Sequence, residues 1–337
     1  MSAPLQLHYI RPFHPADLEP WFILETVLLC LNLTVMTCFI VVLSRVHMHQ
    51  NLKILSIYTV SMYFPSILAR FLILALQSSV LEQPEDPNQS RLVIVCSFFR
   101  IYHMVLCITL PDWLFIERKL ALVYVQDYEQ KKRLWIAVSV IALCAVFVGS
   151  VTMIYIFNIL TWSELSFPVC ILGLIGALLF FHLVWKSKEL ERELSKIGRK
   201  SSITYTLSLR FQLAENLWSS TLIRNAIITC GVINSTGLLS YLAAKTPMAI
   251  EYLGEEKAQY MDQVFNLCIA INGPLAVAGT LFYNEYLMNL VRTTFCGSAK
   301  SNETTDVGQV YFKQLHTQWN RVEEENPKRR MTRVTTA

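Results

Sequence analysis

The stretch LWIAVSVIALCAVFVGSVTMIYIF, residues 134–157, decides the fold class of this chain. None of its 24 residues carries a charge. A transmembrane α-helix needs about 20 consecutive apolar residues to cross the hydrocarbon core of a bilayer. A membrane-spanning strand would instead alternate apolar and polar residues, and this stretch does not. We therefore predict a membrane-spanning helix at this position.

Six further apolar blocks lie on either side of this stretch. Of the 337 residues, 53% are hydrophobic and only 16% are charged, against roughly 25% charged residues in soluble domains. Such a chain has too little charge to cover a water-facing surface. The sequence therefore predicts an all-α integral membrane protein with seven transmembrane helices. The expected spans are residues 21–43, 54–76, 92–116, 134–157, 168–185, 219–244 and 264–290.

Lys and Arg residues are distributed very unequally between the two sides of these spans. The connections on one side, together with the segment from residue 291 onward, carry 22 of them, whereas the other side carries four. Cytoplasmic loops of membrane proteins carry the excess of positive charge. We therefore predict an extracellular N-terminal segment over residues 1–20, a transmembrane domain over 21–290 and a cytoplasmic tail over 291–337.

Three charged residues, Glu25, Arg70 and Arg100, lie in the outer halves of the predicted spans. A charge at the membrane centre costs about 2.5–3.5 kcal/mol on insertion scales, so such residues are usually paired or functional. Because consecutive spans tend to be neighbours, we predict an ion pair between Glu25 and Arg70. Arg100, with His103 one turn below, is then a candidate contact for an anionic or polar ligand. All four residues form the hypothetical ligand site, and a purely structural role is the alternative.

The nine cysteines show no CxxC motif and no His/Cys cluster, so we predict no metal site. Cys96 and Cys170 lie near the outer ends of their spans, where they either form a disulfide in the oxidising exterior or stay free. Cys296 follows the seventh span in a juxtamembrane position that suits S-palmitoylation, although it is equally compatible with a free thiol. Asn88 begins a glycosylation sequon, Asn-Gln-Ser, in the first outer loop.

The chain lacks the patterns of common catalytic sites. It contains no HExxH, no GxSxG and no phosphate-binding glycine loop. We expect no enzymatic activity, no cofactor and no nucleic-acid partner. Membrane lipid is the partner that the composition itself implies.

Two stretches on the predicted cytoplasmic side are patterned. The first, ERKLA at residues 117–121, closes the third span, and the second, LSLRFQLAENL at residues 207–217, precedes the sixth. Together with Phe13-His14-Pro15 they resemble the nematode serpentine chemoreceptors, most closely the class epsilon (Sre) family of the Sra-type group. The resemblance extends from the first span to the seventh.

This resemblance implies the architecture of a G-protein-coupled receptor and a role in chemosensation. It implies a small environmental ligand in the outer half of the bundle, a heterotrimeric G protein at the inner face, and the plasma membrane of sensory cilia as the location. By position, Glu117 and Arg118 resemble the ionic lock of rhodopsin-like receptors, with Arg210 and Glu215 as candidate partners across the inner face. A solvated ion pair at the membrane boundary is the alternative interpretation of Glu117 and Arg118.

The sequence also departs from rhodopsin-like receptors. The sixth span holds no proline, and the seventh reads Asn272-Gly273-Pro274, where the proline predicts a kink because it removes one backbone donor. The alternative functions are a ligand-gated channel and a small-solute transporter with seven spans. A channel of the insect odorant-receptor type would place the N-terminus inside, which the loop charges disfavour.

Overall fold

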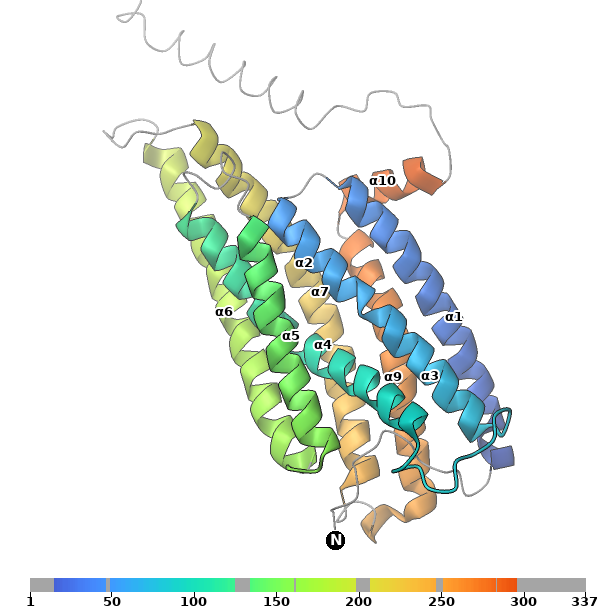
Figure 1. The fold of residues 1–337 in the computed structure, drawn as a ribbon. Helices are drawn as coiled ribbons and strands as arrows, with labels where there is room; N and C mark the ends of the chain where they lie inside the picture. The colour runs from blue at the N-terminus through green and yellow to red at the C-terminus, as the bar shows by residue number, and fades with distance from the viewer. Residues whose placement is uncertain are drawn as a thin grey trace, which may run out of the picture. The chain divides into compact units, whose positions relative to one another are not determined.

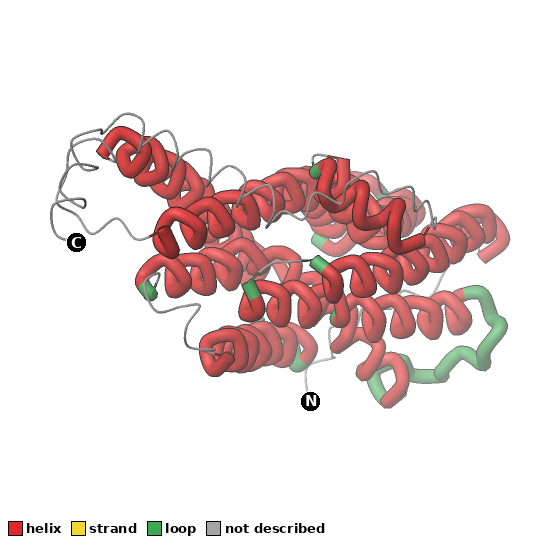
Figure 2. The backbone as a smooth tube through the Cα atoms, turned by 90° about the horizontal axis from the view of Figure 1, so that it is seen from above, coloured by secondary structure: helices red, strands yellow, loops and turns green. Residues whose placement is uncertain are grey.

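The computed structural model describes residues 15–46, 49–124, 134–160, 162–197, 207–246, 251–282 and 284–295. The regular elements within these residues are helices, and no strand occurs among them (Figures 1 and 2). The chain divides into two compact units, Met1–Leu290 and Val291–Ala337. The helices are α1 (Pro15–Arg45), α2 (Gln50–Ser61), α3 (Tyr63–Gln77), α4 (Arg91–Val123), α5 (Leu134–Ile156), α6 (Trp162–Ile197), α7 (Leu207–Lys245), α9 (Glu255–Phe282) and α10 (Glu285–Phe295).

Seven helical segments among the described residues are long and apolar enough to cross a membrane, which confirms the predicted number. The second span is built from two helices, α2 and α3, and the other six from one helix each. Neighbouring helices of the first unit pack along one another, with α7 against α9, α4 against α6 and α1 against α9. The spans are Glu19–Arg45, Gln50–Gln77, Arg91–Ala121, Leu134–Ile156, Glu164–Glu189, Ile223–Ala244 and Glu256–Phe282.

The seventh span lies eight residues earlier than predicted, at Glu256–Phe282 instead of 264–290. Its outer end contains Glu256, Lys257 and Asp262, and these charges concealed the start of the helix in the sequence. At the other end, Asn284 accepts a hydrogen bond from the backbone N–H of Leu287 at 3.0 Å and so caps the separate helix α10. The prediction that the seventh span continues to residue 290 was therefore wrong.

The second span is interrupted at Met62, between α2 and α3. Pro65 explains this break, because its ring has no N–H to donate to the carbonyl of Ser61 four residues earlier. A proline is tolerated in the first turn of a helix, which is where Pro65 lies in α3. The local sequence thus accounts for two shorter helices within one span.

A buried asparagine connects α1 to α9 beside Pro274. Because Pro274 has no N–H, the carbonyl of Ala270 lacks its usual helical donor. Asn32 Nδ2 donates to this carbonyl oxygen at 2.9 Å. Gly273 permits the close approach, since a Cβ on it would lie 2.4 Å from Asn32 Oδ1. The side chain of α1 therefore replaces the hydrogen bond that the proline removes, and α9 continues as one helix.

Two glycines bring α4 and α6 into close contact. A Cβ on Gly173 would lie 2.4 Å from the carbonyl oxygen of Ile108, and a Cβ on Gly176 would lie 2.2 Å from Asp112 Oδ1. Small residues of this kind allow the backbones of membrane helices to approach closely. This contact sets the position of α4, which carries residues of both the outer and the inner polar sites described below.

Candidate functional site

Buried polar side chains cross the outer half of the first unit, and we call them the outer polar layer. It consists of Glu25 on α1, Arg70 on α3, Arg100 on α4, and Asp262 and Asn266 on α9. Each of these five residues is at most 4% exposed. Ionisable groups at such depth need partners within the protein.

Glu25 and Arg70 form the ion pair that the sequence predicts. Arg70 donates from Nε and Nη2 to the two carboxylate oxygens of Glu25, at 2.5 and 2.6 Å, and from Nη1 to Gln77 Oε1 at 3.1 Å. This bidentate geometry is the strongest arrangement for a guanidinium and a carboxylate. The pair joins the first span to the second.

Arg100 joins the third span to the seventh. Its Nη2 donates to Asn266 Oδ1 at 2.5 Å, and Asn266 Nδ2 donates to Asp262 Oδ2 at 3.2 Å. Arg100 Nη1 is buried and has no hydrogen-bond partner among the described residues. The layer thus contains a donor that a polar group or a water molecule would satisfy.

His103 lies one turn beyond Arg100 on α4 and contacts two residues that line a cavity. Its ring meets that of Tyr63 edge-on, with centroids 4.1 Å apart, and its Nε2 lies 3.4 Å from Cys107 Sγ. Tyr63 and Cys107 both line a cavity, whereas none of Glu25, Arg70, Arg100 and His103 does. Direct contact between these four residues and a ligand stays a prediction.

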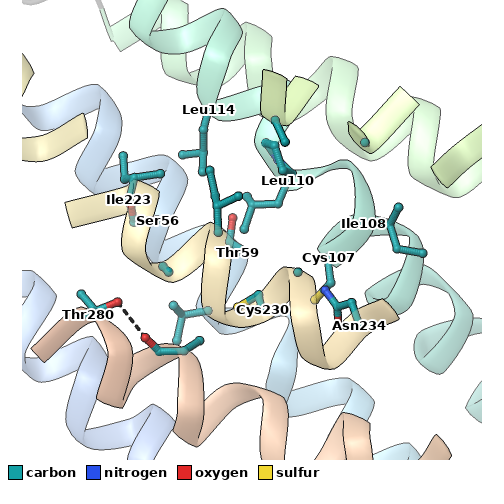
Figure 3. A pocket seen from close by; sticks show the side chains of 18 of the residues that line it. Ser56, Thr59, Cys107, Ile108, Leu110, Leu114, Ile223, Cys230, Asn234 and Thr280 are labelled. Carbon is teal, nitrogen blue, oxygen red and sulfur yellow. Dashed lines mark hydrogen bonds between the residues drawn. The ribbon is translucent and has the colours of Figure 1, made fainter. Parts of the chain in front are cut away.

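This cavity has a volume of about 370 Å³ and lies among α1, α2, α3, α4, α6, α7 and α9 (Figure 3). On α4 its lining begins at Cys107, seven residues or about 10 Å beyond Arg100 along the helix. None of the described residues that line it is charged. Its volume and mainly apolar lining are typical of small-molecule sites. The polar lining residues are Ser56, Thr59, Tyr63, Cys107, Cys170, Cys230, Asn234, Ser235 and Thr280.

Few hydrogen-bonding groups of the lining are available to a ligand. The hydroxyls of Thr59, Ser235 and Thr280 donate to carbonyls of their own helices at 3.0, 2.7 and 2.7 Å. Asn234 Oδ1 accepts from Asn272 Nδ2 at 2.8 Å, while Asn234 Nδ2 has no hydrogen bond among the described residues. Figure 3 labels Asn234 among the side chains that line the pocket. Among the described lining groups, the amide of Asn234 and the hydroxyls of Ser56 and Tyr63 therefore remain as hydrogen-bond donors for a ligand, within largely apolar walls.

Glu117 and Arg118 are buried at the inner end of α4, at 0% and 2% exposure. Arg118 donates to both carboxylate oxygens of Glu117, at 2.5 and 2.7 Å, and from Nη1 to Ser219 Oγ on α7 at 3.1 Å. Such burial excludes the solvated pair considered above. Arg118 thus joins the third span to the helix that forms the sixth.

His49, which precedes α2, lies within electrostatic range of this pair. Burial and the positive charge of Arg118 lower the pKa of His49 from 6.5 to about 4, although Glu117 acts in the opposite direction. His49 is therefore neutral at pH 7, and its Nδ1 accepts a hydrogen bond from the N–H of Asn51 at 3.3 Å. We call Glu117, Arg118 and Ser219 the inner site. Because His49 is neutral, the cation beside Glu117 in this site is Arg118 and not His49.

Comparison with known proteins decides the family. The model of the Sre family, described as Sre G protein-coupled chemoreceptor, matches residues 10–320. The chain belongs to the Sre family. Serpentine receptor class epsilon-2 of Caenorhabditis elegans is 28% identical over 336 residues, covering 88% of both chains. Serpentine receptor class epsilon-1 of the same organism is 23% identical over 296 residues, covering 80% of this chain and 82% of its own.

Membership of the Sre family confirms the chemosensory, G-protein-coupled type of receptor that the two cytoplasmic motifs indicate. The protein is a multi-pass membrane receptor, not an enzyme, and the channel and transporter alternatives are not favoured. Within the described residues, no group of three or more His, Cys, Asp or Glu side chains is placed to hold a metal ion.

The two cysteines near the outer ends of the third and fifth spans of this Sre receptor do not lie together. Of the two alternatives for Cys96 and Cys170, the structure has the free thiols and not the disulfide. Cys96 packs in a buried cluster with Ala69 and Ile73, whereas Cys170 lines the cavity. Their different surroundings explain why similar depth in two spans did not bring the thiols together.

Three further predictions on this receptor are left untested. Asn88 lies in the turn region between α3 and α4, where its backbone N–H donates to Asp86 Oδ1 at 2.9 Å, and its glycosylation stays a prediction. Arg210 and Glu215 belong to α7, but their side chains lie outside the described part of the chain. Cys296 also lies outside the described residues.

Sequence reasoning missed the residues that line the cavity. The pairing of Asn234 with Asn272 was the feature most readily predicted from the sequence, because two asparagines in neighbouring spans are costly unless they bond to each other. Asn32 could have been found in a similar way, since Pro274 leaves a carbonyl that some side chain must satisfy. Ser219, the partner of Arg118 on α7, carries no such indication because a serine near a span end is common.

Proposed function

We propose that this Sre receptor binds a small, neutral, largely apolar environmental molecule in its cavity and signals to a heterotrimeric G protein at its inner face. The observation that carries the proposal is a cavity of about 370 Å³ whose lining, within the described part of the chain, contains no charged residue. We further propose that the receptor acts at the plasma membrane, in sensory cilia, as the family implies.

The chemistry of the lining supports this ligand class. An ionised ligand would lose its hydration without finding a countercharge, and burying an unpaired charge is very costly. A ketone, aldehyde or ester oxygen would instead accept a hydrogen bond from Asn234 Nδ2, while its hydrocarbon part would contact apolar side chains. His103, which lies one turn from Arg100 on α4, contacts two of the lining residues, Tyr63 and Cys107.

The geometry of the inner site supports the proposal that a G protein is the partner. Arg118 is held at once by Glu117 on its own helix and by Ser219 on α7. A contact between two helices that breaks in one state is the kind of two-state element that allosteric coupling requires. We propose that release of Arg118 from Ser219 accompanies activation and opens the inner face to the G protein.

Replacing Ser219 with alanine is expected to raise signalling in the absence of ligand. Loss of one hydrogen bond removes about 1 kcal/mol from the resting state, which corresponds to a roughly fivefold shift in a two-state equilibrium. Basal cyclic-nucleotide and calcium signals in transfected cells measure this shift. Ser240→Ala is the matched control, because the hydrogen bond that Ser240 on α7 makes within the described residues goes to the carbonyl of Thr236 in its own helix. Equal basal signals in the two variants would contradict the proposed lock.

A chemical screen in a heterologous cell tests the ligand class. We expect responses to small neutral carbonyl compounds and esters, read as calcium or cyclic-nucleotide signals that untransfected cells lack. Carboxylates and phosphates of similar size are expected to be inactive. Activity confined to anionic compounds would overturn the cavity assignment and return the ligand site to Arg100.

A further inference from the structure

The wall of the cavity between α6 and α7 is open to the surroundings of the protein. Leu174 on α6 lines the cavity and is 60% exposed. Gly231 and Ser235 on α7 also line the cavity and are exposed. A Cβ built on Gly231 would meet no atom within 4 Å. We call these three residues the lateral rim.

The lateral rim lies at the depth of the lipid tails. Leu174 is ten residues, or about 15 Å, from the start of the fifth span at Glu164. Gly231 is thirteen residues, or about 20 Å, from the end of the sixth span at Ala244. Because the hydrocarbon core is about 30 Å thick, the rim faces hydrocarbon and not water.

The described outer side of the cavity is closed by packed side chains. The five residues of the outer polar layer are at most 4% exposed. Beside them, Tyr155 and Tyr241 join α5 to α7 through hydroxyls 2.6 Å apart, and the ring of Tyr241 lies 4.7 Å from that of Phe265. A molecule coming from above would have to displace an ion pair and several hydrogen bonds. A molecule coming through the lateral rim would displace none of these.

We propose that the lateral rim is a portal through which ligands enter the cavity from the bilayer. This inference rests on the proposed function, in which the cavity is the ligand site. The portal restricts ligands to neutral molecules that partition into lipid, because a charge is costly within the hydrocarbon layer. The receptor thus samples the membrane-dissolved concentration of its ligand, and lipid solubility becomes part of its specificity.

A lipid-soluble photolabel tests the portal without requiring a known ligand. The receptor is reconstituted in phosphatidylcholine nanodiscs with a neutral trifluoromethyl phenyl diazirine, irradiated, and mapped by mass spectrometry. Met36 and Tyr63 report on the interior, because both line the cavity and are only 2% and 6% exposed. We expect both to be labelled, together with lipid-facing residues such as Val146.

Filling the rim supplies the decisive comparison. Gly231→Phe places a ring in the open space and is expected to abolish labelling of Met36 and Tyr63, while Val146 stays labelled. Gly149→Phe is the matched control, because Gly149 on α5 also has no atom within 4 Å of a built Cβ and does not line the cavity. Ser235→Phe fills the same rim from another position if the first variant fails to fold.

Two outcomes would overturn the portal. One is interior labelling that persists in both rim variants, and the other is labelling of Val146 without labelling of Met36 or Tyr63 in the unmodified receptor. Because photolabelling needs no signalling, these results are separate from the fate of the proposed function. Interior labelling by the diazirine combined with a silent chemical screen would leave the portal standing and remove the ligand assignment.

Discussion

Glu25→Gln is expected to remove most of the receptor from the cell surface. The substitution leaves Arg70 as a buried cation without a countercharge at 3% exposure, and the amide of glutamine replaces one of the two acceptor oxygens by a donor. Breaking a buried ion pair by removing one partner typically costs about 3–5 kcal/mol, a large part of the stability of an ordinary protein. Antibody binding to an N-terminal tag on intact cells, relative to total protein, measures the loss.

The double variant Glu25→Leu/Arg70→Met separates charge from packing. Replacing both members of a buried pair by apolar residues is often neutral or stabilising, so we expect surface delivery to recover. Glu82→Gln is the control for removing an acidic residue, since Glu82 is exposed in the loop after α3. Equal surface delivery of Glu25→Gln and Glu82→Gln would show that the pair has no structural role.

Ala226→Phe is expected to abolish the response to an active compound while leaving surface delivery intact. Ala226 on α7 lines the cavity, so the larger ring occupies space that the ligand needs instead of overpacking a filled core. We expect no calcium signal at concentrations that saturate the unmodified receptor. Ala142→Phe is the matched control because Ala142 is exposed on α5 and does not line the cavity. A normal dose response in Ala226→Phe would place the ligand elsewhere.

Several features of this fold follow from local rules and were therefore predictable. Uninterrupted apolar blocks identify spans, and the pairing of Glu25 with Arg70 follows from the cost of isolated charges in neighbouring helices. The start of the seventh span was not predictable in this way, because Asp262 reads as a loop residue in the sequence. In the structure Asp262 is 4% exposed and accepts a hydrogen bond from Asn266.

The cavity could not be predicted from the sequence, and the reason is a different one. Its lining residues come from seven helices and are ordinary apolar and small polar residues, which would serve equally well in a filled core. Whether they leave a space depends on how closely the helices approach, and Gly173 and Gly176 set that distance between α4 and α6. The sequence emphasises charged residues such as Arg100, whereas the space for a ligand lies about 10 Å further along the same helix.

The inner site was predictable only in part. Glu117 and Arg118 are buried as a pair and their described partner on α7 is Ser219, while their role as an ionic lock stays a prediction. A neutral hydroxyl holds a guanidinium less strongly than a carboxylate does, so the resting state is expected to be held less tightly than by a full ion pair.

Agonist-stimulated nucleotide exchange is the most direct test of whether the cavity controls coupling to a G protein. The purified receptor in nanodiscs is mixed with a heterotrimeric G protein and with a neutral compound from the chemical screen, and the exchange rate is followed with a fluorescent guanine nucleotide. We expect a saturable rise in exchange for the unmodified receptor and for Ala142→Phe, and no rise for Ala226→Phe. A compound-evoked ionic current from the same nanodisc preparation fused to a planar bilayer, with exchange unchanged, would contradict this expectation.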